Sequence, residues 1–166
     1  MNARKLQLSF AFTLGLLALV GMLTLLGTWG SGPALAQAGT GTIRVATTGN
    51  DAPGCGGTGN PCRTVQYAVD QAANDEEIWV ATGIYTGVQA RAGITQVVCI
   101  SKTLTLRGGY SADFNEWDPE TYLTTLDAQG SGRVLYITGD ISPTVEGFRI
   151  TGGDATGLGG GWWGLS

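Results

Sequence analysis

The sequence predicts an all-β fold, a parallel β-helix built from a few coils of about 22 residues each. Three segments share the pattern apolar, polar, apolar, polar, Gly, and they begin at Leu104, Leu126 and Phe148, at a constant spacing of 22 residues. A fainter copy begins at Ile78. A short strand and a turn glycine that recur at a step in the low twenties are typical of solenoid proteins, in which each coil packs on the next.

Short strand-like segments rich in β-branched or aromatic residues make up most of the chain. They cover residues 42–46, 78–81, 96–100, 104–107, 125–127, 134–137 and 144–150. The intervals between them are too short and too rich in glycine for crossover helices, so we expect each strand to lie on its equivalent in the next coil.

The 22-residue step assigns side chains to rows. Two inward rows are expected, Ile78, Leu104, Leu126 and Phe148 in the first and Val80, Leu106, Ala128 and Ile150 in the second, with Trp79, Thr105, Asp127 and Arg149 pointing outward. Gly108, Gly130 and Gly152 would take the corners, where a positive φ suits glycine.

Residues 63–74 have the periodicity of an amphipathic helix. Val65, Ala68, Val69 and Ala72 fall on one face, and Thr64 can cap the start. A solenoid must cover its terminal coils, because an open coil exposes apolar side chains and strand edges. We therefore expect this helix to cap the N-terminal end of the coils.

Residues 1–38 are typical of a secretory signal peptide. Arg4 and Lys5 precede an uncharged apolar run over residues 10–26, and small residues follow up to Ala36 and Ala38, after either of which cleavage is expected. An uncleaved membrane anchor is the alternative. The remaining chain divides into an N-terminal strand with a cysteine-bracketed loop (39–62), the capping helix and coils (63–156), and a glycine-rich tail (157–166).

Three cysteines in an exported chain suggest disulfide chemistry. Cys55 and Cys62 bracket a loop rich in glycine, and we expect them to form a disulfide that contributes about 2–3 kcal/mol through loop-closure entropy. A pair of zinc ligands is the alternative, although the spacing does not match a zinc knuckle. Cys99 lies in an apolar strand, where we expect a buried thiol.

Composition excludes several functions. The chain contains no histidine, which removes Ser-His-Asp and Cys-His catalysis and histidine-based metal sites. Its net charge is −4, and no basic patch is present to neutralise phosphates, so neither nucleic acid nor, after signal cleavage, a membrane is an expected partner.

Residues 63–153 resemble the N-terminal portion of right-handed parallel β-helix proteins of the pectin-lyase-like superfamily. The resemblance is carried by PCRTVQYAVDQAANDEEIWVATGIYTG, ISKTLTLRGGYS, TTLDAQGSGRVLYITG and VEGFRITGG. It implies an exported bacterial protein. Catalytic members use acidic residues on one outer face, either calcium-binding carboxylates with an arginine base or clustered aspartates. No catalytic motif matches residue by residue, so none is transferred to this chain.

Two groups of charged residues are candidate sites. Asp113, Asn115, Glu116 and Asp118 could supply oxygen ligands to a Ca²⁺ cofactor; the alternative is a solvated insertion that Trp117 and Tyr122 hold against the coils. The second group is Asp127 with Arg107, Arg133 and Arg149, which are expected on one outer face. These charges either form a lyase-like site or are ordinary surface ion pairs.

The repeat stops just after its third clear copy, and residues 157–166 are expected to be a truncated tail. Val145, Phe148 and Ile150 would then lie on an open last coil that can self-associate. The expected function is that of a non-catalytic fragment of a secreted or cell-envelope β-helix protein, whose parent binds or adheres to extracellular polysaccharide. The alternatives are a remnant of a polysaccharide lyase or glycoside hydrolase, and a membrane-anchored envelope protein.

Overall fold

A computed structural model describes residues 41–91 and 93–156, and the expected signal peptide and glycine-rich tail lie outside these residues. The described elements are β1 (Ile43–Val45), α2 (Val65–Gln71), β2 (Glu77–Ala81), β3 (Gly83–Tyr85), β4 (Gln89–Arg91), β5 (Ile94–Ile100), β6 (Thr105–Tyr110), β7 (Thr124–Asp127), β8 (Arg133–Ile137), β9 (Thr144–Glu146) and β10 (Phe148–Thr151). The predicted all-β class is confirmed. Within these ranges no helix is long and apolar enough to cross a membrane.

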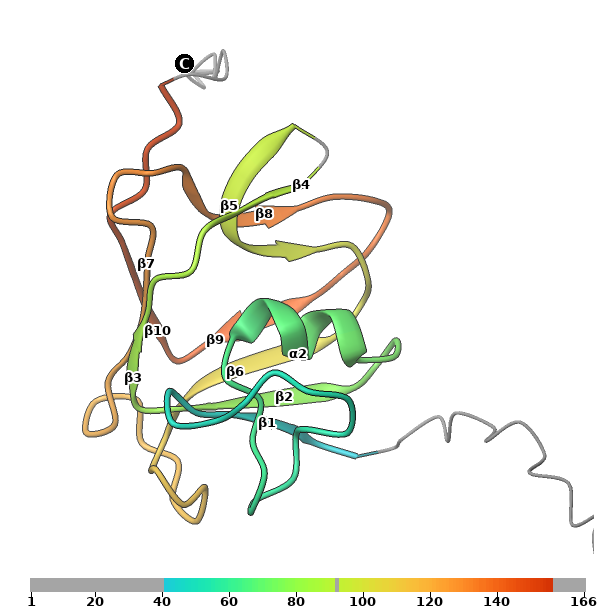
Figure 1. Ribbon diagram of the computed structural model, residues 1–166, viewed down its shortest axis with the longest axis vertical. Coiled ribbons are helices and arrows are strands. Elements are labelled where there is room, and N and C mark those ends of the chain that lie inside the picture. The colour runs from blue at the N-terminus through green and yellow to red at the C-terminus, as the bar shows by residue number, and fades with distance from the viewer. Residues whose placement is uncertain (1–40, 92, 157–166) are drawn as a thin grey trace, which may run out of the picture. The chain divides into compact units, whose positions relative to one another are not determined.

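The strands form three sheets around a common interior (Figure 1). The first sheet has the order β1-β2-β6-β9, the second β10-β7-β3 and the third β4-β5-β8. All pairings are parallel except β4 with β5, which forms an antiparallel hairpin. The chain passes through the first, second and third sheets in that order with β2, β3 and β5, and again with β6, β7 and β8. It then enters the first two sheets a third time with β9 and β10.

The predicted 22-residue register is wrong. Ile78 pairs with Leu106 rather than Leu104, and Leu106 pairs with Val145. Leu126 lies in the second sheet. The copies that begin at 104 and 126 therefore belong to different sheets, and their similarity reflects a shared strand-and-turn pattern rather than stacking. Loops of unequal length between the strands make the true intervals unequal.

The register of the second sheet also differs from the predicted one. Ile150, not Phe148, pairs with Leu126, and Tyr85 pairs with Leu126 on the other side. In the first sheet, the residue that pairs with Trp79 is Arg107 rather than Thr105. The expected rows are thus replaced by new ones. Burial alternates along β7 and over the first four residues of β2, but not along β5 or β10.

Glycines mark several corners, as predicted for two of the three positions. Gly130 and Gly152 have φ values of 72° and 65°. Gly108 instead lies within β6, and Gly109 beside it has a φ of 90°. Gly147, with a φ of 74°, divides the predicted strand 144–150 into β9 and β10. A Cβ on Gly147 would lie 2.2 Å from the carbonyl oxygen of Gly108, so the two backbones meet where only glycine fits.

The helix covers one end of the interior, as predicted (Figure 1). It is shorter than residues 63–74, because Ala72 is already extended at ψ 139°. Thr64 caps its start by accepting a hydrogen bond from the backbone N–H of Tyr67. At the C-terminal end of the helix, the ammonium group of Lys102 donates to the carbonyl of Ala72 over 2.6 Å. This bond gives a partner to a carbonyl that has none within the helix.

The core is continuous from the helix to the sheets. It contains the helix residues Val65, Ala68 and Val69, and side chains of all three sheets, among them Ile78, Leu106, Leu126, Val98 and Ile100, all 0 to 2% exposed. One apolar interior therefore holds the first two passages of the chain together, and the helix packs over its N-terminal side on β1, β2 and β5.

Candidate functional site

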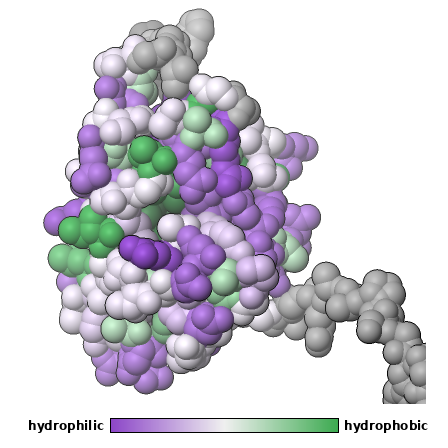
Figure 2. Space-filling model, viewed as in Figure 1, coloured by the Kyte–Doolittle hydropathy of each residue, from purple (hydrophilic) through white to green (hydrophobic). Residues whose placement is uncertain are grey.

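The structure has an open cavity of about 290 Å³ beside the first turn of α2. It lies between the helix start and the segment that follows β3, where the surface is hollowed (Figure 2). Its volume is close to the lower limit of ligand sites, about 300 Å³. Thr47, Arg63, Ile84, Tyr85 and Thr86 are among the residues that line it.

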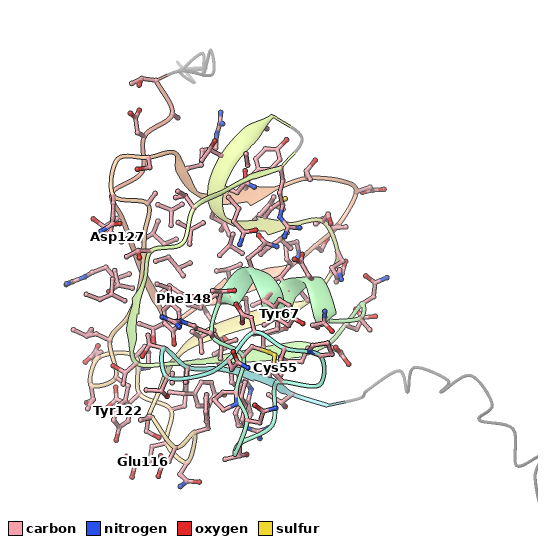
Figure 3. All side chains as sticks on the ribbon, viewed as in Figure 1. Cys55, Tyr67, Glu116, Tyr122, Asp127 and Phe148 are labelled. Carbon is pink, nitrogen blue, oxygen red and sulfur yellow. A yellow bond between two sulfur atoms is a disulfide. The ribbon has the colours of Figure 1, made fainter. Side chains whose placement is uncertain are left out.

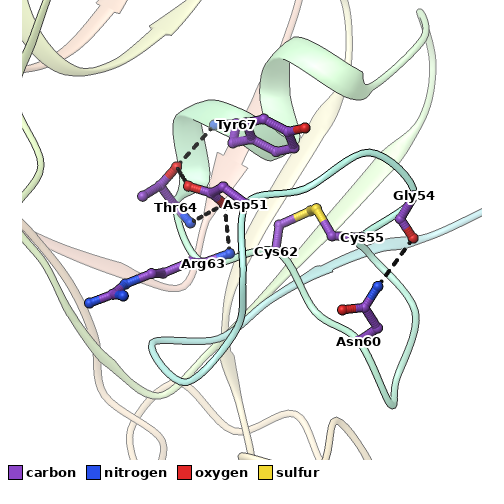
Figure 4. The surroundings of a disulfide bond; sticks show 8 residues. All are labelled: Asp51, Gly54, Cys55, Asn60, Cys62, Arg63, Thr64 and Tyr67. Carbon is purple, nitrogen blue, oxygen red and sulfur yellow. Dashed lines mark hydrogen bonds between the residues drawn. A yellow bond between two sulfur atoms is a disulfide. The ribbon is translucent and has the colours of Figure 1, made fainter.

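A hydrogen-bonded turn and a disulfide hold the wall that carries Arg63 (Figure 4). The carboxylate of Asp51 accepts hydrogen bonds from the backbone N–H groups of Arg63 (2.8 Å) and Thr64 (3.0 Å), and from the Thr64 hydroxyl (2.7 Å). The predicted disulfide between Cys55 and Cys62 is confirmed, and Cys62 directly precedes Arg63. The backbone of Arg63 is therefore fixed, while its side chain is exposed to solvent.

The opposite wall is formed by β3 and the residues after it. Gly83 allows β3 to approach Thr47, because a Cβ at this position would lie 2.8 Å from the Thr47 methyl group. The hydroxyl of Tyr85 donates to the carbonyl of Ala81 over 3.0 Å, and burial raises the pKa of this phenol above its ordinary value. Tyr85 is therefore a neutral, inward-facing part of the wall, whereas Ile84 is 65% exposed.

The cavity offers a cation, hydroxyl groups and an apolar surface. Arg63 supplies a guanidinium group, Thr47 and Thr86 are exposed residues that carry hydroxyls, and Ile84 presents an aliphatic side chain. No carboxylate is among the residues that line it. These groups can bind a ligand through a charge, hydroxyl hydrogen bonds and apolar contact.

The structure does not gather the predicted calcium ligands around one point. Asp113 accepts hydrogen bonds from the Ser111 hydroxyl (2.6 Å) and the Asn115 amide (2.7 Å), and these bonds, Ser111 first, lower its pKa. Asp118 accepts from Thr121, whose side-chain hydrogen bond is the main cause of a lowered pKa. Among residues 41–91 and 93–156, no three acidic or cysteine side chains form a group that could hold a metal.

The remaining ligand candidate, Glu116, accepts a hydrogen bond from the hydroxyl of Tyr122 within the same loop (Figure 3). Trp117 donates to the carbonyl of Gly108 over 2.9 Å and lies under the guanidinium of Arg107, 5.3 Å from its ring centre. The loop is thus held against β6 by Trp117, as expected, and its acidic groups serve as local hydrogen-bond acceptors.

The predicted grouping of Asp127 with three arginines is correct only for Arg149, which lies on the neighbouring strand β10 of the same sheet, whereas Arg107 and Arg133 lie on the first and third sheets. Asp127 lies on β7 in the second sheet and accepts a hydrogen bond from the backbone N–H of Gln129, and Figure 3 shows it far from Glu116 in the acidic loop. Arg107 lies on the first sheet, where it forms ion pairs with Glu77 (2.8 Å) and Glu146 (2.6 Å). These groups are about one-third exposed, so each ion pair contributes at most about 1 kcal/mol.

The first sheet also carries a cluster of aromatic rings and an arginine beside these ion pairs. Trp79 stacks on Tyr110 with ring centres 4.4 Å apart, and the guanidinium of Arg44 lies 5.0 Å from the Trp79 ring. Tyr110 and Phe114 are buried here at 4% and 7% exposure, which makes a second small core under the acidic loop. These rings stabilise the sheet and its loop.

Cys99, predicted to be a buried thiol, is instead half-buried and free. Its backbone is bonded to Gln66 on α2, which places it at the contact between helix and third sheet.

The cavity was not predicted from the sequence. Thr47, Arg63 and Thr86 belong to three separate loops, and no spacing signal links them. Only the Cys55–Cys62 pair pointed to this region, because it indicated a rigid loop directly before Arg63. No protein-family model, no curated protein and no solved structure matches this chain significantly.

Proposed function

We propose that this chain is the N-terminal part of an exported right-handed parallel β-helix protein of the pectin-lyase-like type. Three observations support this. The chain passes through three sheets in a recurring order with parallel pairing from one passage to the next, a helix covers the core beside the first strands, and a disulfide fits an oxidising compartment. Export would use residues 1–38 as a cleaved signal peptide, and N-terminal sequencing of the exported protein distinguishes cleavage after Ala36 or Ala38 from an uncleaved anchor.

We further propose a non-catalytic surface role in which the cavity beside α2 binds an acidic sugar unit of an extracellular polysaccharide. The observation that carries this proposal is Arg63, a guanidinium on a fixed backbone at the wall of a cavity that no carboxylate lines. A guanidinium can bind a carboxylate with two parallel hydrogen bonds. The hydroxyls of Thr47 and Thr86 suit the hydroxyls of a sugar, and Ile84 suits the apolar face of its ring.

The affinity of one such site is expected to be low, because the chain as a whole has a net charge of −4 and repels polyanions at a distance. Surface adhesion can nevertheless use weak sites, since many copies on one cell engage one polymer and the second contact is intramolecular. The proposal therefore concerns recognition of a local chemical group rather than tight binding of a soluble sugar.

A binding experiment with matched variants tests this function. An oligogalacturonide and a neutral gluco-oligosaccharide of equal length are titrated into the protein, and amide chemical shifts are followed by NMR. We expect the acidic sugar alone to shift residues around the cavity. Arg63→Gln should weaken binding about tenfold or more, the value of a hydrogen bond to a charged group. Arg149→Gln, which removes the same charge from exposed β10, should not.

Three results would overturn the proposal: no binding, equal loss in both variants, or no preference for the acidic sugar. Prolonged incubation with the polyuronide tests the non-catalytic role. New unsaturated or reducing ends above those of a mock preparation would favour the alternative, a remnant of a lyase or hydrolase.

A further inference from the structure

Two large aliphatic side chains are exposed on the outer face of the second sheet. Ile84 on β3 is 65% exposed, and Leu123, which directly precedes β7, is 49% exposed. Thr124 and Leu126 are at most 1% exposed and point inward, so Leu123 and Thr125 face outward. Thr125 is the register partner of Ile84, which makes Leu123 a diagonal neighbour of Ile84 across the two strands. The strand spacing and the rise of two residues place their backbones roughly 8 Å apart.

β3 holds the backbone of Leu123 in place. The carbonyl oxygen of Leu123 accepts hydrogen bonds from the backbone N–H of Gly83 over 3.1 Å and from the hydroxyl of Thr82 over 3.0 Å. Only its side chain is left to be ordered when a ligand lies on it, so the entropic cost of binding there is small. Ile84, Leu123 and Thr125 together form an uncharged surface with one hydroxyl group, here called the aliphatic surface.

The aliphatic surface begins at the rim of the cavity beside α2, because Ile84 belongs to both. β3 is an edge strand of its sheet, with β7 and Leu123 on one side and the cavity with Arg63 on the other. Hydrophobic residues gather at the left edge of the view in Figure 2, where Figure 1 places this sheet. A ligand that fills the cavity and continues across β3 therefore passes from a cationic wall onto an aliphatic one.

The size and chemistry of the aliphatic surface fit a sugar unit rather than a protein. Three side chains fall short of the roughly 800 Å² that each partner buries in a stable protein–protein interface. A pyranose ring has an apolar face of C–H groups bordered by hydroxyls, which matches two aliphatic side chains beside the hydroxyl of Thr125. Because the surface contains no charged group, it recognises the face of a ring rather than its carboxylate.

We propose that the aliphatic surface is a second sugar subsite, which binds the unit linked to the acidic unit in the cavity. Arg63 holds the first unit, the linkage passes Ile84, and the second unit lies over Leu123. This inference rests on the proposed sugar binding at the cavity and deepens it. The site selects a linked acidic saccharide over a free uronic acid, because two linked contacts bind more tightly than either alone.

Titrations with galacturonic acid and digalacturonic acid, followed by NMR, test the second subsite. We expect the disaccharide to bind about fivefold more tightly, the value of partly covering a leucine side chain. Galacturonic acid should shift the amide signals of Arg63 and Thr86 but not that of Leu123. The disaccharide should shift the amide signals of Leu123 and Thr125 as well.

Two matched variants separate this gain from general changes in the protein. Leu123→Ser should abolish most of the gain and leave the affinity for galacturonic acid unchanged. Ile137→Ser, on β8 in the third sheet and similarly exposed (45% against 49%), should keep the gain.

The outcomes distinguish the second subsite from the cavity itself. Equal affinity for the two sugars, or a gain that persists in Leu123→Ser, would overturn the subsite, while binding of galacturonic acid that depends on Arg63 would still support the cavity. A gain that is lost equally in Ile137→Ser would also contradict the subsite. Absence of binding of either sugar would overturn the cavity and the subsite together.

Discussion

The side chain of Gln66 pairs with the backbone of Cys99 as a neighbouring strand would. Its carbonyl oxygen accepts from the Cys99 N–H over 2.6 Å, and its amide nitrogen donates to the Cys99 carbonyl over 3.3 Å. Gln66 is 2% exposed and Cys99 is half-buried, so both bonds are partly shielded from water. A single glutamine on α2 thus supplies hydrogen-bond partners to the backbone of Cys99 on β5 and attaches the helix to the third sheet.

Replacing Gln66 with methionine should therefore destabilise the protein by about 1–3 kcal/mol, because two partly buried backbone groups lose their partners while the volume is kept. Gln71→Met, on the exposed last turn of α2, is the control and should change the free energy of unfolding by less than about 0.5 kcal/mol. Chemical denaturation measures both. Equal effects would mean that the Gln66 hydrogen bonds contribute nothing to stability.

The Cys55–Cys62 disulfide should stabilise the fold through the loop before Arg63. Replacing both cysteines with serine is expected to lower the free energy of unfolding by about 2–3 kcal/mol, since the unfolded chain regains the entropy of the open loop. Denaturation with and without a reducing agent measures this difference. Cys99→Ser is the control, and reduction should destabilise it as much as it destabilises the unmodified chain.

Gly147 should tolerate alanine less well than Gly139, although both have a positive φ, 74° and 105°. Gly139→Ala meets only a side-chain methyl group at 3.8 Å and should cost about 1–2 kcal/mol from the backbone conformation. Gly147→Ala also forces its Cβ against the Gly108 carbonyl, which adds about 1–3 kcal/mol. The difference in unfolding free energy between Gly147→Ala and Gly139→Ala measures the cost of the close approach of β6 to the β9–β10 corner. Equal free energies of unfolding in the two variants would refute this cost.

Acid should loosen the loop that contains Asp113 and Asp118. Hydrogen bonds to their carboxylates lower both pKa values in the folded chain. The stabilisation is therefore fully present above the ordinary pKa of an aspartate and is lost as the pH falls through the lowered values. Carbon NMR titration should give midpoints below the ordinary aspartate value. Asp113→Asn should make unfolding less dependent on pH in this acidic range, and an unchanged dependence would count against the argument.

Calcium should leave the same loop unchanged, because its carboxylates are divided among separate local hydrogen bonds. Amide signals of residues 111–122 are expected to stay in place when millimolar calcium is added or removed with a chelator. Shifts confined to this loop would revive Asp113, Asn115, Glu116 and Asp118 as ligands.

Features that depend on neighbours in the chain could be predicted. Thr64 and the apolar face that follows it indicate a capped helix, and the short glycine-rich loop indicates the Cys55–Cys62 bond. Strand positions were predicted within a few residues, because alternation and turn residues are local signals. The exceptions were β3 and β4, three-residue strands that are too short to show a period.

The sequence by itself thus determined the all-β class, the cap and the disulfide, since each follows from residues a few positions apart. Only the tertiary structure decided which strand lies on which. The loop over residues 111–123 and the β4–β5 hairpin lengthen individual passages, and they break the 22-residue step that local similarity suggested. The cavity around Arg63 depends on that pairing, because it is made by segments that meet only after the sheets have formed.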